Sequence, residues 1–206
     1  MNTYLEDVAP LAAERWREHF INWITHDDIT FEQAASPWLQ KVIINGGPHV
    51  IHLLPYATTV HTWIMNTYHE RVADVKKSLV MSQSKINLSF DAWSSLNHRS
   101  LLGIVAHWID EKRTLKTALL GLRSFEGHTG SDMADALTPV IKLFDIGGEK
   151  IRAFQIDNAT SNDTAMSALA ARIPGIDVKE SRLRCFGHVV NLVVKALLYG
   201  SKSSTL

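Results

Sequence analysis

The feature that most constrains the fold of this chain is a change in hydrophobic period partway along it. In the first part, apolar residues recur at three- and four-residue steps, which is the spacing of one face of a helix. Beyond that point Ile86, Leu88 and Phe90 alternate with polar residues, which is the spacing of a strand with one buried face. The sequence therefore predicts an all-helical N-terminal region over residues 1–84 and a sheet-containing domain over residues 85–206.

The helical region carries three apolar stripes and most of the tryptophans. We expect helices over residues 5–24, from Pro37 to the glycines at 46 and 47, and over residues 59–81. An aromatic ring buries a large apolar area, which favours core positions for Trp16, Trp23, Trp38 and Trp63. The alternative is a surface for a partner or DNA, and exposure of the rings decides between the two.

The second region alternates strand and helix patterns in a definite order. We expect strands over residues 86–90, 100–109, 114–122, 151–156 and 182–186, and helices over residues 133–144, 161–172 and 188–199. Ser161 or Asn162 is the expected cap of the helix that ends at residue 172. The first three strands are joined by turns and should form an antiparallel meander. The order predicts an α/β fold, a mixed five-stranded sheet with helices on its faces.

Charge and cysteine content exclude several classes of protein. Lys+Arg and Asp+Glu are balanced at 21 each, so any contact with DNA has to come from local patches. The single cysteine, Cys185, excludes an internal disulfide framework and a zinc site of several thiolates, and favours an intracellular, reducing compartment. No apolar run is long enough to cross a membrane, and the N-terminus lacks a secretory signal.

Five segments carry a more specific signal than the periodicity does. They are LSFDAWS at 88–94, GIVAHWID at 103–110, GHTG at 127–130, FQIDNATSND at 154–163 and RCFGHVVNL at 184–192. In this order they resemble successive landmarks of the hAT superfamily of DNA transposases. The helical region, with FINW and FEQAASPW, is similar to the segment that precedes the catalytic domain in fungal-type members. The resemblance covers nearly the whole chain.

The resemblance implies a ribonuclease-H-like domain with strand order 3-2-1-4-5, in which the first and fourth strands are neighbours. The active site of the family uses three acids, and the matched motifs assign the first two positions to Asp91 and Asp157. Clustered carboxylates suit Mg²⁺ or Mn²⁺, and transfer of phosphodiesters uses two such ions about 3.5–4 Å apart. His188, in the segment that resembles the family's Cys/Asp-x-x-His motif, is expected beside these acids or against DNA.

Plainer interpretations of the same residues stay open. A single aspartate at the end of a strand is usually a helix cap or a turn former, and His188 can equally be a satisfied core histidine. Asp132 and Asp163 each come early in a predicted helix, where a carboxylate is stabilised by the helix dipole. With one cysteine in the chain, Cys185 and His188 do not predict a zinc site.

The resemblance also implies what these 206 residues do not contain. The third acid of the family is a glutamate that follows a large helical insertion, and the sequence stops before that point. We therefore expect a transposase fragment whose parent cleaves and joins DNA in the nucleus at transposon ends, but which is inactive as this chain. The alternative is a noncatalytic or domesticated module that binds DNA or protein. The last helix is apolar around most of its circumference, which predicts self-association.

Overall fold

The computed structural model describes residues 10–46, 53–95, 99–127 and 129–200. The chain divides into two compact units, Met1–Val72 and Ala73–Leu206. The predicted helix start at residue 5 and the predicted stop at Gly47 lie outside the described residues. None of the helices in the described ranges is both long and apolar enough to cross a membrane.

The first unit is built from helices around a small apolar core. It contains α1 (Pro10–His26), α2 (Phe31–Ala34), α3 (Pro37–Gly46) and the first part of α4 (Ala57–Val80). The buried centre of the core consists of Phe20, Ile24, Ala34 and Val60. Around it pack Trp16, Trp23 and Trp63. The prediction of core positions is confirmed for these three tryptophans.

Trp38 departs from that prediction. It lies in the first turn of α3 and is 73% exposed, so the expectation of a core position was wrong. Its ring is covered by the ammonium group of Lys41, which lies 4.2 Å from the ring centroid. A cation over an aromatic face stabilises both groups without burying either. The apolar spacing of a short helix does not distinguish a face that packs on the core from a face that meets solvent.

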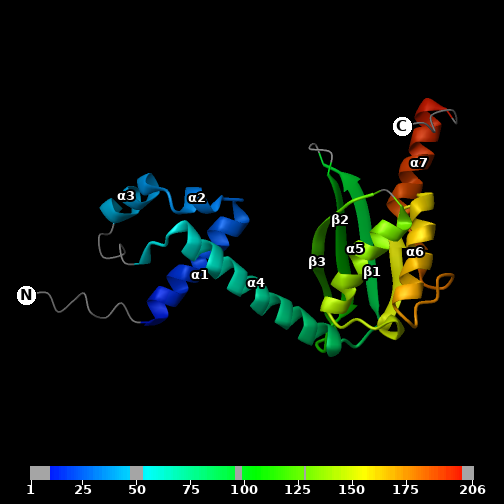
Figure 1. Cartoon of the computed structure of the whole chain (residues 1–206), viewed down its shortest axis with the longest axis horizontal. Coiled ribbons are helices and arrows are strands. Elements are labelled where there is room, and N and C mark those ends of the chain that lie inside the picture. The colour runs from blue at the N-terminus through cyan, green and yellow to red at the C-terminus, as the bar shows by residue number, and fades with distance from the viewer. Residues whose placement is uncertain (1–9, 47–52, 96–98, 128, 201–206) are drawn as a thin grey trace, which may run out of the picture. The chain divides into compact units, whose positions relative to one another are not determined.

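The second unit contains a five-stranded sheet in the order β3-β2-β1-β4-β5 (Figure 1). The strands are β1 (Ile86–Ser94), β2 (Ser100–Ile109), β3 (Leu115–Phe125), β4 (Ile151–Ile156) and β5 (Arg182–Arg184). The first three pair antiparallel, while β4 pairs parallel to both β1 and β5. The predicted α/β fold class, strand order and antiparallel meander are therefore confirmed.

Two helices lie side by side against this sheet, α5 (Gly130–Leu143) and α6 (Thr160–Arg172) (Figure 1). Between helices and sheet lies a core of fully buried side chains that includes Leu88, Leu102, Ile104, Leu137, Ile141, Phe154, Met166 and Leu169. Because strand side chains alternate between the two faces, the residues of β1 between these core positions point to the opposite face. That face carries Ser89, Asp91 and Trp93.

The last turns of α4 belong to the second unit. Leu79 is buried, and the indole Nε1 of Trp108 donates a hydrogen bond of 3.0 Å to Oγ of Ser78. The sheet begins at Ile86, one residue after the start of the predicted domain, but the compact unit begins earlier, at Ala73, and so includes these turns.

The C-terminal part of the unit differs from the prediction in its limits. β5 ends at Arg184 and α7 (Phe186–Tyr199) begins two residues later, with Cys185 as its N-cap. The expected strand to residue 186 and helix from residue 188 were therefore placed two residues late. None of the residues of α7 is buried.

Candidate active site

The parallel pairing of β1 with β4 brings the two predicted acids to neighbouring positions on the sheet. Ser89 on β1 is the partner of Gln155 on β4. Asp91 lies two positions after Ser89 within β1, and Asp157 lies two positions after Gln155, directly after the last residue of β4. Neighbouring strands are about 4.8 Å apart, so the two carboxylates leave the sheet side by side.

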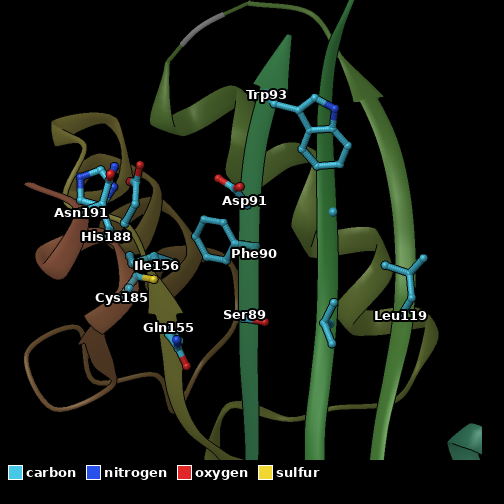
Figure 2. Close-up of a pocket in the computed structure, with 14 residues that line it drawn as sticks. Ser89, Phe90, Asp91, Trp93, Leu119, Gln155, Ile156, Cys185, His188 and Asn191 are labelled. Carbon is cyan, nitrogen blue, oxygen red and sulfur yellow. The ribbon is translucent and has the colours of Figure 1, made fainter. Parts of the chain in front are cut away.

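Two cavities meet at these aspartates, and both aspartates line both cavities. The larger has a volume of about 590 Å³ and is also lined by Trp93, His188 and Asn191. Figure 2 shows the carboxylate of Asp91 pointing from β1 toward the side of this cavity formed by His188 and Asn191. The smaller has a volume of about 210 Å³ and lies toward the start of α6. Asp91, Asp157 and Trp93 are therefore the residues that the two linings share.

Each carboxylate has one oxygen occupied by hydrogen bonds. Oδ1 of Asp91 accepts the backbone N–H of Ala92 at 3.0 Å. Oδ1 of Asp157 accepts the backbone N–H of Ala159 at 3.0 Å and a second hydrogen bond from the side-chain amide of Asn162. Among the described hydrogen bonds none involves Oδ2 of either aspartate. One oxygen of each carboxylate is thus open to a ligand.

The charge of the site favours a cation. The side chains described along the two cavity walls include neither lysine nor arginine. Two carboxylates without a positive partner repel one another, and a divalent ion between them relieves that repulsion. Carboxylate oxygens are also the ligands that Mg²⁺ and Mn²⁺ prefer. The donors present therefore fit one divalent ion with water in the rest of its coordination shell.

Among the described residues, two acids line the two cavities and no third acid does. Within them, no group of three or more His, Cys, Asp or Glu side chains is placed to hold a metal ion. Asp132 instead closes a capping box, in which its Oδ2 accepts the N–H of Thr129 at 2.9 Å. Asp163 forms an ion pair with Arg182. Neither of these acids lines the cavities around Asp91, so the structure brings together only the pair that the motifs indicated.

His188 lies in the first turn of α7, half-buried, on the wall of the larger cavity. The fold therefore brings it to the same cavity as both aspartates, although the three residues are far apart in the sequence. Their roles as metal ligands and as a supporting histidine stay predictions.

Asn162 is a polar residue of the site whose position in the helix the sequence analysis predicted wrongly. It was expected, with Ser161, as a helix cap, but the N-cap of α6 is Ala159 and its side chain makes no capping bond. The carboxylate of Asp157 accepts the N–H of Ala159, the residue directly before the helix. Asn162 therefore lies inside the first turn of α6, where it is buried and donates to Asp157.

Trp93 covers part of the sheet beside Asp91, and a glycine on the neighbouring strand makes room for it. Gly103 is the β2 partner of Asp91. A Cβ atom at Gly103 would lie 3.3 Å from the indole ring of Trp93, which is tighter than most such contacts. The pair makes an apolar wall next to the carboxylates. No local pattern in the sequence indicates this contact, because the two residues meet only through strand pairing.

A sheet of this order, with one aspartate within β1 and another directly after the neighbouring strand β4, is typical of ribonuclease-H-like domains. Residues 89–182 match the family model of the ZBED1 RNase-like domain. Over 144 residues, 66% of this chain, the sequence is 28% identical to a Zea mays protein named as an AC transposase. A second Zea mays protein, named as an AC9 transposase, is also 28% identical over 144 residues.

The matched segments make up 18% and 17% of the two maize proteins, so the chain spans less than a fifth of the length of the curated relatives it matches. Together with the strand order, these matches confirm the resemblance to the hAT-superfamily transposases.

Proposed function

We propose that this chain forms part of an hAT-type transposase that cleaves DNA at transposon ends and joins it to a target with the help of Mg²⁺ or Mn²⁺. The observation that carries the proposal is the position of Asp91, within β1, and of Asp157, directly after the neighbouring parallel strand β4, in the lining of the same two cavities. The similarity to maize proteins named as transposases supports the choice of DNA as substrate. The nucleus is then the compartment in which the protein acts.

The residues of the site have distinct roles in this proposal. Asp91 and Asp157 would each offer a carboxylate oxygen to a divalent ion, which would bind the scissile phosphate beside them. His188 lies on the wall of the same cavity and donates a ring N–H to a phosphate oxygen. Divalent ions, when bound, supply Lewis-acid stabilisation of the charge on the phosphate and lower the pKa of the attacking hydroxyl or water.

The 206-residue polypeptide by itself is proposed to be inactive. Two carboxylates leave most of the octahedral shell of Mg²⁺ to water, and such an ion is held weakly. Efficient phosphodiester cleavage depends on holding the ions and the nucleophile in line. The described residues provide no third acid for this purpose.

Incubation of the purified chain with labelled transposon-end DNA and Mn²⁺ tests the proposal. We expect no sequence-specific nicking, and DNA binding in Mn²⁺ that Asp91→Asn and Asp157→Asn weaken, since each removes a ligand of the ion that binds the phosphate. Metal-dependent nicking that both substitutions abolish would support the transposase chemistry but contradict the inactivity of this chain. Nicking that persists in both variants would show that the reaction uses another site.

The second candidate is a noncatalytic module that binds DNA or protein. It is favoured by the exposed apolar residues of α7 and by the lack of a three-ligand metal group among the described residues. This candidate predicts that binding of DNA or of a partner is the same with EDTA as with Mn²⁺. A requirement for the divalent ion would count against it.

A further inference from the structure

Asn162 is one of the few polar side chains buried in the second unit, with 6% of its surface exposed. It lies in the first turn of α6 and lines the smaller of the two cavities beside Asp91 and Asp157. Burying an amide costs free energy unless its polar atoms find partners. Its Nδ2 has a partner in Asp157, while its Oδ1 is buried without one.

This arrangement leaves only one favourable orientation for the amide. If the amide were rotated to exchange its oxygen and nitrogen, Oδ1 would face the carboxylate of Asp157, and two acceptors would repel one another. With Nδ2 toward Asp157, the side chain and the N–H of Ala159 both donate to the same carboxylate oxygen. Rotation of the carboxylate is thereby restricted, and Oδ2 becomes the oxygen available to a ligand.

The first turn of α6 is itself fixed by its neighbours. Gly130, at the start of α5, lies so close to this turn that a Cβ atom there would overlap the backbone nitrogen of Ala165 and the carbonyl oxygen of Ser161. In the same turn, Asp163 forms an ion pair with Arg182 of β5. Asn162 is therefore attached to a turn that both α5 and β5 hold in place.

We propose that Asn162 is a positioning residue that orients Asp157 as a ligand for a divalent cation. The inference rests on the proposed function, because it takes Asp157 to be a ligand of the ion. Asn162 does not itself bind the metal. It acts by holding Oδ1 of Asp157, so that the binding-competent orientation of the carboxylate exists before the ion arrives. Outer-shell hydrogen bonds of this kind contribute about 10–100-fold to metal affinity in other sites.

The test is a Mn²⁺ titration of the full 206-residue chain and its Asn162→Leu variant, followed by electron paramagnetic resonance of the free ion. Leucine is close to asparagine in size and shape but has no donor. We expect the affinity for Mn²⁺ to fall about tenfold or more. Ser161→Ala is the matched control, since Ser161 lines the same cavity from the same turn and makes no described hydrogen bond to Asp157. Its affinity should equal that of the unmodified chain.

A purely structural role for Asn162 would give a different result. Asn162→Leu would then lower the thermal unfolding midpoint and leave the Mn²⁺ affinity of the folded protein unchanged, which would overturn the inference. If Asp91→Ala and Asp157→Ala abolish Mn²⁺ binding while Asn162→Leu does not alter it, the inference fails and the proposed function survives. If the unmodified chain binds no Mn²⁺, both fail.

A second measurement covers the case in which Asn162→Leu does not fold. In the unmodified chain, the side-chain NH₂ of Asn162 should exchange slowly with solvent and shift in the NMR spectrum when Mg²⁺ is added. The conservative variant Asp157→Asn should abolish the shift with Mg²⁺. An amide signal that exchanges rapidly and is insensitive to Mg²⁺ would overturn the inference.

Discussion

Asp110, in the turn between β2 and β3, shows how one carboxylate can fix a hairpin. Its Oδ1 accepts the backbone N–H of Thr114 at 2.8 Å and that of Lys112 at 2.9 Å. The bond from Thr114 is the main cause of a lowered pKa at Asp110, and burial opposes it, while the bond from Lys112 and the charge of Lys116 add to the lowering. Between them Arg113 adopts a φ of 59°, a conformation that the bonded turn maintains.

A pH-dependent contribution to stability follows from this lowered pKa. Because the carboxyl group has a lower pKa in the folded state, it stabilises the fold above its ordinary pKa of 3.8 and loses this effect as the pH falls through the folded value. We expect Asp110→Asn to lower the urea midpoint at pH 6 and to lower it less at pH 3. Equal losses at the two pH values would contradict the assignment.

Gly130 provides a test of the close contact between α5 and α6. Gly130→Ala should destabilise the second unit by about 1–3 kcal/mol, because the methyl group would overlap backbone atoms that cannot move independently. Gly187→Ala is the matched control: it also lies at the start of a helix, and its Cβ would come no closer than 3.9 Å to Cys185. Chemical denaturation measures both, and an unchanged midpoint for Gly130→Ala would contradict the tight packing.

At the scale of elements, α7 differs from every other long helix of the second unit because none of its residues is buried. Val193 is 62% exposed and Leu197, one turn later on the same side, is 82% exposed. An apolar face of this extent is typical of helices that pack against another surface.

Self-association of the isolated chain is therefore expected to depend on α7. The double substitution Val193→Glu and Leu197→Glu should reduce the proportion of oligomer in sedimentation velocity and lower the binding of a hydrophobic dye. Lys195→Glu is the control, since it changes the charge of the same turn and removes no apolar side chain. Oligomers of equal abundance in all three proteins would show that association uses another surface.

Periodicity predicted the strands well and their ends less well. The alternation in β1 is a local property, because it depends on which side of one strand is buried. The end of β5 is followed at once by Cys185, the N-cap position of α7, so it depends on where the next helix begins. The exposure of Trp38 and the burial of Asn162 depend on packing between elements, and a single segment of sequence does not contain that information.

At the scale of the whole molecule, the site is a consequence of topology. Asp91 and Asp157 are 66 positions apart in the sequence, the difference between their residue numbers, and only the pairing of β1 with β4 brings them together. Motifs that resemble those of hAT transposases indicated both residues. The hydrogen bond from Asn162, the wall made by Trp93 and Gly103, and the division of the chain within α4 all required the folded structure.

We propose that Asp91 and Asp157 share one divalent ion. A double-mutant cycle of Mn²⁺ affinity, measured by calorimetry, tests this most directly. If one ion bridges both carboxylates, Asp91→Asn and Asp157→Asn each weaken binding by about tenfold or more, and the double variant is little weaker than either single one, because the sites are coupled. Losses that multiply in the double variant, or affinities that do not change in the single variants, would contradict the shared site.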